Sequence, residues 1–178
     1  MDYNIEEVTD MNAEACDTAK GITKGRIYSR TATVEKHLSA TALDVNIRSE
    51  NCIEVRHRCK SGHEIRLDAR VYERSLDLTV PIPLQFRAGS KDVTDLLNEM
   101  NDWARENGHP EYWTMGYRGK VYLYSKVIDD DRIDEMDDTL RYLVSDMLEF
   151  AEYGINKLSN ELSDMYVPAA EETGDMYR

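Results

Sequence analysis

The sequence has few residues of the kinds that build export signals, disulfide frameworks and membrane spans. Its cysteines, Cys16, Cys52 and Cys59, are odd in number and lack a framework spacing, which favours reduced thiols. No run approaches the roughly 18 apolar residues of a membrane helix. The opening residues, MDYNIEEVTD, are acidic and lack the apolar region of a secretory signal. These absences predict a cytoplasmic protein with no membrane partner.

Basic residues are also in short supply. The 178 residues include 22 Lys and Arg against 35 Asp and Glu, for a formal net charge of -13. A nucleic-acid-binding protein needs a basic face that displaces counterions, so no nucleic-acid partner is expected. The charge is uneven, because residues 48–74 carry a net positive charge while the remainder is strongly acidic.

Motifs for catalysis and metal binding are weak. There is no glycine-rich phosphate loop, and no histidine stands beside a nucleophile in a known pattern. Cys52, His57, Cys59 and His63 fall close together but lack the tight cysteine pair of a structural zinc site. The acidic run at 129–131 fits a helix start better than a magnesium site. The sequence therefore predicts no catalytic residue, no metal, no cofactor and no enzyme.

Alternating apolar residues predict an antiparallel sheet. The second hairpin is rich in aromatic residues, which are expected to pack across strands, with a peptide or base contact as the alternative. Pro81 and Pro83 cannot donate to a strand ladder, so the end of their strand should lie at an edge or leave the sheet. The predicted strands cover residues 45–47, 52–59, 65–71, 76–82, 112–117 and 120–128.

Apolar residues at helical spacing predict four helices. Gly21 follows the first helix, and Thr31 or Thr33 is expected to cap the second. Ser90 or Asp92 should cap the third, which ends at a glycine and a proline near residue 108. The predicted helices cover residues 4–20, 31–43, 92–107 and 130–165.

The last predicted helix is long for a protein of this size. An unbroken helix over 130–165 would span about 54 Å, while the whole globule should measure about 35 Å across. Either Gly154 breaks the helix, or its second half packs on the first helix or on a second subunit. The apolar stripe formed by Ile155, Leu158, Leu162 and Met165 is therefore a candidate partner-binding surface, and a homodimer is expected.

The first hairpin gathers arginines on one face. Two registers are open, and the one that sets Arg56 opposite Asp68 pairs most charges favourably, so it is preferred. The alternative sets Arg56 opposite Arg66 and suits a glycine bulge at the tip. The simpler explanation for these arginines is that they pair with acidic residues within the sheet. The alternative is that they bind a partner. The candidate partner-binding residues on the sheet are Arg56, Arg58, Arg66 and Arg70.

The order of elements and one local pattern point to a known family. The stretch DVTDLLNEMN precedes a Gly-Pro break, an aromatic hairpin, an acidic turn and LRYLVSDMLEFAE. Over residues 31–153 this resembles the YbjN-like family, whose fold is similar to class I type III secretion chaperones. The resemblance implies an α+β fold of order α-β-β-β-α-β-β-α, a twisted antiparallel sheet packed by helices. An extra N-terminal helix and an extended C-terminal helix would add to it.

These observations predict a non-enzymatic protein-binding module, chaperone-like or regulatory. Residues 1–167 are expected to form one α+β domain, with residues 168–178 as a flexible acidic tail. An acidic inhibitor or nucleic-acid mimic that binds a basic protein is the alternative function. A small enzyme that uses a carboxylate or cysteine in a pocket is a third.

Overall fold

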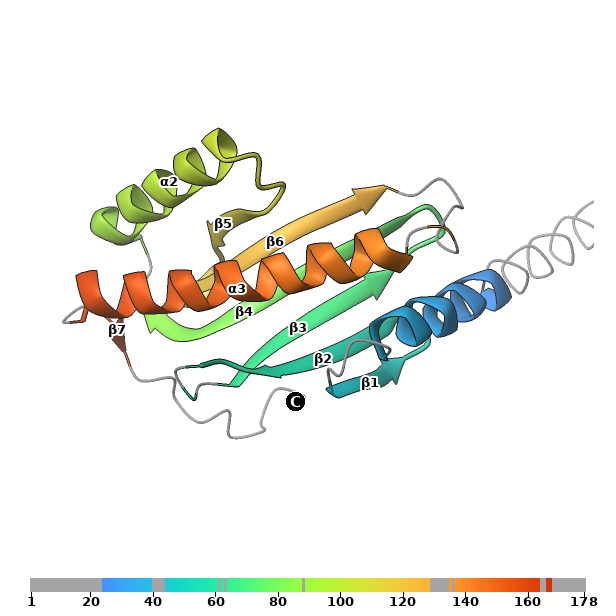
Figure 1. Ribbon diagram of the computed structural model, residues 1–178. Coiled ribbons are helices and arrows are strands. Elements are labelled where there is room, and N and C mark those ends of the chain that lie inside the picture. The colour runs from blue at the N-terminus through green and yellow to red at the C-terminus, as the bar shows by residue number, and fades with distance from the viewer. Residues whose placement is uncertain are drawn as a thin grey trace, which may run out of the picture.

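The computed structural model describes residues 24–39, 44–60, 62, 64–87, 89–128, 135, 137–163 and 166–167. The predicted first helix and the tail lie outside these residues. A helix over residues 24–39 opens the described chain (Figure 1). The elements that follow are β1 (Asp44–Ser49), β2 (Cys52–Arg58), β3 (Glu64–Val71), β4 (Ser75–Phe86), α2 (Lys91–Glu106), β5 (Tyr112–Met115), the 3-10 turn η1 (Tyr117–Gly119), β6 (Lys120–Ile128), α3 (Asp137–Glu161) and β7 (Tyr166–Val167).

The strands form one antiparallel sheet in the order β1-β2-β3-β4-β6-β5, and β7 pairs with the end of β4. The expected α+β class with a twisted antiparallel sheet is confirmed, and the chain has four strands between its first described helix and α2. Both predicted hairpins are present. The second turns through Arg118 and Gly119, which both have positive φ angles.

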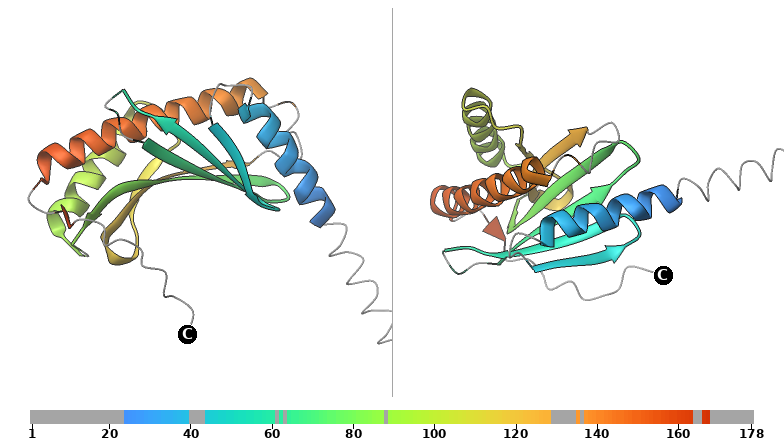
Figure 2. Two further views of the ribbon diagram at one scale, coloured as in Figure 1. Left: turned by 90° about the horizontal axis from the view of Figure 1, so that it is seen from below. Right: turned by 45° about the vertical axis from the view of Figure 1, so that its right-hand side comes forward.

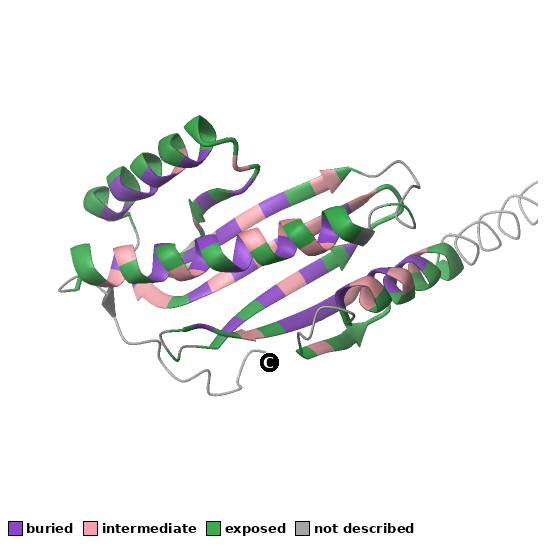
Figure 3. Ribbon diagram, in the orientation of Figure 1, coloured by how far each residue is buried: buried purple, intermediate pink, exposed green. Residues whose placement is uncertain are grey.

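Helix α3 lies across one face of the sheet, over β3 and β4 (Figures 1 and 2). Strand residues that face it are almost wholly apolar and buried, while the alternate residues are polar and more exposed (Figure 3). Among the described residues, no helix covers the opposite face. The fold therefore has a covered apolar face and an open polar face.

The second predicted helix begins earlier than expected. Thr31 and Thr33 lie inside the helix over 24–39, and their hydroxyls donate to the carbonyl oxygens of Ile27 and Ser29 at 2.8 and 3.2 Å. A threonine can make this bond within a helix as readily as it can cap one, so residue type alone did not fix the start. Arg30 ties the helix to the sheet by donating to the Tyr72 carbonyl oxygen at 2.9 Å.

The preferred register of the first hairpin is wrong. Arg56 lies opposite Arg66, and Glu54 lies opposite Asp68. The turn decides the register: Gly62 takes a φ angle of 88°, and its N–H donates to the Cys59 carbonyl oxygen at 3.0 Å. Directly opposed like charges are tolerated because each finds an opposite charge elsewhere on the same face.

Strand β4 explains the position of its two prolines. It is central, but its ladder with β3 ends at Thr79, and its ladder with β6 shifts register after Pro81. Pro81 and Pro83 therefore lie where β4 no longer has β3 beside it, as the absence of their N–H groups predicts.

Helix α3 passes through Gly154 without a break, and its 25 residues span about 37 Å. Ile155, Leu158 and Leu162 are buried in the core of the same chain, with exposed fractions of 3%, 0% and 8%. The prediction that they form a partner surface is therefore wrong, because the fold of the chain already covers them. Met165 lies outside the described residues. No described helix is long and apolar enough to cross a membrane.

Candidate functional site: the open face of the sheet

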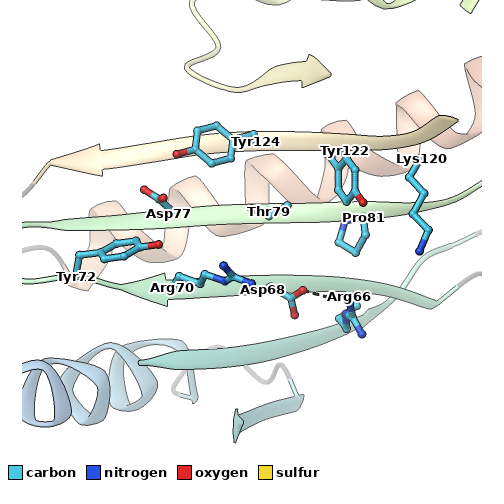
Figure 4. A pocket seen from close by; sticks show the side chains of 10 residues that line it. All are labelled: Arg66, Asp68, Arg70, Tyr72, Asp77, Thr79, Pro81, Lys120, Tyr122 and Tyr124. Atoms are coloured by element: carbon cyan, nitrogen blue, oxygen red, sulfur yellow. Dashed lines mark hydrogen bonds and ion pairs between the residues drawn. The ribbon is translucent and has the colours of Figure 1, made fainter. Parts of the chain in front are cut away.

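The open face of the sheet contains a shallow hollow of about 310 Å³. Cross-strand pairing places its side chains on one face of β3, β4 and β6, with α3 behind the sheet (Figure 4). The lining residues are Arg66, Asp68, Arg70, Tyr72, Asp77, Thr79, Pro81, Lys120, Tyr122 and Tyr124.

The open face has a charge opposite in sign to that of the whole chain. Its strand residues include seven basic and five acidic side chains, a balance of +2 within a chain of -13. The rest of the chain therefore carries -15. The basic residues are Arg48, Arg56, Arg58, Arg66, Arg70, Lys120 and Lys126, and the acidic residues are Asp44, Glu54, Glu64, Asp68 and Asp77.

Glu54 anchors the basic side of this face. Its side chain is 3% exposed, and it accepts hydrogen bonds from Arg48 at 2.5 Å and from Arg56 at 2.8 Å. Arg66 lies 3.9 Å from its other oxygen. The hydrogen bond from Arg48 lowers the pKa of Glu54, with help from Arg56, against the effect of burial. These four residues, here called the Glu54 cluster, hold three arginines at one end of the open face.

Tyrosines form the other side of the hollow. The rings of Tyr112 and Tyr124 pack with centroids 5.2 Å apart, and Tyr112 is 48% exposed. Burial, with Asp77 nearby, raises the pKa of Tyr124, so its hydroxyl stays neutral and able to donate a hydrogen bond. Cross-strand packing of the aromatic hairpin is thus present, and it leaves Tyr122 and Tyr124 directed toward the hollow (Figure 4).

The predicted arginines divide between two roles. Arg56 and Arg66 form ion pairs within the sheet, as the sequence predicted. Their partner is Glu54, whereas the preferred register had set Arg56 opposite Asp68. Arg66 and Arg70 also line the hollow on the open face. Arg58 is the last residue of β2, where its pairing with Glu64 places it at the margin of the open face, and it also borders a second hollow of about 450 Å³ on the α3 side. Both basic and acidic side chains line that second hollow, and most of its lining residues belong to α3.

The cysteine and histidine residues considered for zinc do not converge in the described structure. Cys52 shares the open face with Glu54, whereas His57 points to the opposite face of β2. His63 lies outside the described residues. Burial, with Asp68 nearby, raises the pKa of the Cys52 thiol, which lowers its share of reactive thiolate.

Another group of possible metal ligands was missed from the sequence. His109, Glu111 and Asp146 bring one ligand atom each to within 4.8 Å of one another. They lie at the junction of α2, β5 and α3, on different elements from those that line the open-face hollow. The sequence signal is the Gly-His-Pro-Glu step at residues 108–111, a pattern that predicts the end of a helix. Its third member comes from a helix far along the chain, so spacing could not reveal it.

Comparisons with known proteins show a likeness in fold to a solved structure. The fold is similar to a chain in the crystal structure of the ExsC–ExsE complex, with a TM-score of 0.47 and 13% sequence identity over 71% of this chain and 93% of that chain. No family model matches the sequence, and no curated protein matches it. A similarity of this degree describes the arrangement of elements alone. Membership of the YbjN-like family stays a prediction.

Proposed function

We propose that this protein is a non-enzymatic binding module that recognises an acidic, extended segment of another protein on the open face of its sheet. The function class is chaperone-like or regulatory, as the YbjN-like resemblance implies. The observation that carries the proposal is the locally positive, tyrosine-lined hollow on an otherwise acidic protein.

Charge complementarity favours an acidic occupant. The chain outside the open face carries -15 in sequence, so the arginine- and lysine-bearing strands are where an acidic segment meets the most favourable charge. A nucleic acid would meet the same repulsion over a much longer length, because each of its phosphates carries a charge. A short acidic segment of a protein suits the size of the hollow better.

The residue types of the hollow suit a protein partner. Tyrosine and arginine are enriched among the residues that dominate the binding energy of protein interfaces. Tyr122 and Tyr124 offer flat apolar surface, and Arg70 offers a planar donor group for a carboxylate. Thr79 and Pro81 lie on β4, between the β3 and β6 side chains that line the hollow (Figure 4).

Selection from a library of short random peptides tests the proposal. The wild-type protein should select peptides that are rich in Asp and Glu, and their binding should weaken steeply as salt rises. Arg70→Glu should weaken binding of the selected peptides by about tenfold or more. Isothermal titration calorimetry of the purified variants measures this change.

A matched charge reversal on the helix side is the control. Arg105 lies on α2 with its side chain 76% exposed, so Arg105→Glu changes the net charge by the same amount away from the open face. This variant should bind the peptides as the wild type does. Equal loss of binding in both variants, or selection of basic peptides, would contradict the proposal. Basic peptides would instead support an acidic inhibitor or nucleic-acid mimic.

The homodimer and the cytoplasmic location stay predictions from the sequence. Ile155, Leu158 and Leu162, which prompted the homodimer together with Met165, are buried within the chain, so a dimer would need another surface. Size-exclusion chromatography with light scattering checks this directly. The monomer mass is 20.6 kDa, and a stable dimer would show twice that value.

A further inference from the structure

We propose that His109, Glu111 and Asp146 bind a divalent transition-metal ion, with zinc as the ion that suits them best. This site is separate from the open face and does not rest on the function proposed above. His109 follows the end of α2, Glu111 directly precedes β5, and Asp146 lies in α3. An ion here would join the connection between α2 and β5 to α3, which is distant from it in sequence.

The backbone fixes the first two ligands. Gly108 takes a φ angle of 77°, and the N–H of His109 donates to the Ala104 carbonyl oxygen at 2.9 Å, which closes a Schellman motif at the end of α2. Pro110 then restricts the chain before Glu111. The short step from His109 to Glu111 therefore has little freedom to move.

The distances match those of a small tetrahedral ion. Nδ1 of His109 lies 3.0 Å from Oδ2 of Asp146 and 3.6 Å from Oε2 of Glu111. Bonds of about 2.0–2.1 Å at tetrahedral angles separate two ligand atoms by roughly 3.3 Å. The three atoms need only small shifts to share an ion, and the fourth position would take water or an outside ligand.

Glu111 supplies an independent sign of a missing partner. Its side chain is fully buried, and neither carboxylate oxygen has a hydrogen-bond partner. Buried polar side chains nearly always have such a partner. A bound cation would satisfy both oxygens and stabilise the charged carboxylate.

Aromatic rings hold the histidine in place. The His109 ring stacks on Phe150 at 5.1 Å with an interplanar angle of 14°, and on Trp103 at 5.3 Å and 23°. Phe150 lies one helical turn after Asp146, so one face of α3 supplies both a ligand and the packing that orients another. The aromatic rings limit the access of water from one side, while His109 and Asp146 remain partly exposed on the other.

The donor set selects the class of metal. Magnesium and calcium prefer sites made entirely of oxygen ligands, whereas an imidazole nitrogen suits zinc and its transition-metal neighbours. Two carboxylates and a neutral imidazole carry a charge of about -2, which a divalent ion neutralises. Zinc accepts this mixture at tetrahedral geometry without redox chemistry.

Metal titration of the chelator-stripped full chain tests the proposal. Calorimetry with zinc should give one ion per chain, and excess magnesium should not compete. Cobalt should give visible d–d bands of a nitrogen- and oxygen-ligated site without the thiolate charge-transfer band that cysteine binding would add. His109→Gln, Glu111→Gln and Asp146→Asn should each weaken binding by more than the roughly 10–100-fold that loss of an outer-shell group costs.

Asp138→Asn is the matched control, because Asp138 lies on the same helix as Asp146 and is fully exposed. It should bind zinc as the wild type does, and zinc should raise the melting temperature of both. Circular dichroism identifies any ligand variant that fails to fold. If the Glu111 or Asp146 variant does, zinc affinity is compared between the wild type and the conservative variant His109→Gln. Absence of zinc binding, a thiolate band, or equal affinity in folded ligand variants would overturn the proposal.

Discussion

Glu54 shows how one buried charge organises a surface. The acid is 3% exposed, yet its arginine partners remain about half exposed, so their charges keep much of their water. The arginines therefore avoid most of the desolvation that makes a fully buried ion pair costly. The arginines neutralise the Glu54 carboxylate, and they also give the open face its net positive charge.

The pH dependence of stability should show the role of Glu54. Its pKa is lowered in the folded state, so its contribution is present above its ordinary value of about 4.5 and is lost as the pH falls through the folded value. Glu54→Gln should therefore lower stability near pH 7 and flatten the loss of stability in acid. Urea unfolding of both proteins from pH 7 to pH 3 measures this. A variant with an unchanged acid slope would contradict it.

Gly154 lets α3 approach the second hairpin. A Cβ at this position would overlap the indole ring of Trp113 and would lie 3.0 Å from the end of the Met100 side chain. Gly154→Ala should therefore lower the free energy of unfolding by about 1–3 kcal/mol, the usual cost of overpacking. Denaturant unfolding provides the measurement.

The same substitution at Gly25 is the control. Gly25 lies in the helix over 24–39, and a Cβ there would meet nothing within 4 Å. Gly25→Ala should leave stability unchanged or raise it by up to about 1 kcal/mol, because alanine favours helix. Similar losses at both positions would show that the close approach to Trp113 is not the cause.

At the scale of elements, β5 depends on α2. Strand β5 lies at the edge of the sheet and has only four residues. The Asn101 side chain accepts a hydrogen bond from the Trp113 N–H at 2.6 Å and donates to the Trp113 carbonyl oxygen at 2.9 Å. The amide thus serves as a further strand partner and covers part of an edge that could otherwise pair with another chain.

Loss of this amide should destabilise the protein. Asn101→Ala removes both bonds and leaves a backbone N–H without its partner, so we expect a loss of about 1–3 kcal/mol in the free energy of unfolding. Asn98→Ala, one turn earlier on the exposed side of α2, should change it by less than about 0.5 kcal/mol. Equal effects in chemical denaturation would argue against the pairing between Asn101 and β5.

At the scale of the whole molecule, added salt should have opposite effects on the stability of the fold and on the binding of an acidic peptide. A net charge of -13 repels itself in the compact state, and salt screens that repulsion. Raising ionic strength from about 0.01 M to about 0.15 M shortens the screening length from about 30 Å to about 8 Å. The melting temperature should rise by a few degrees, since about 1 kcal/mol corresponds to about 2–4 °C at this size.

An acidic peptide of the kind proposed for the open face should respond in the reverse sense and dissociate as salt rises. Differential scanning calorimetry without peptide and titration with peptide separate the two effects. A melting temperature that falls with salt would show that local ion pairs, such as those of the Glu54 cluster, outweigh the overall repulsion.

The sequence by itself determined the elements and the faces of the sheet. Period-two and three-four patterns depend on neighbouring residues, so they located β3, the second hairpin and α2 closely. The Gly108-Pro110 step likewise identified the end of α2. These signals are local, and each reports a backbone conformation that a few adjacent residues select.

Tertiary structure decided the rest. The hairpin register followed from its turn and from charges on β1, and the stripe of Ile155 and Leu158 proved to be core because it packs into the buried cluster of the same chain. The cluster of His109, Glu111 and Asp146 exists only because α3 passes the end of α2. Contacts between segments far apart in the chain leave no spacing in the sequence, so folding alone brings such groups together.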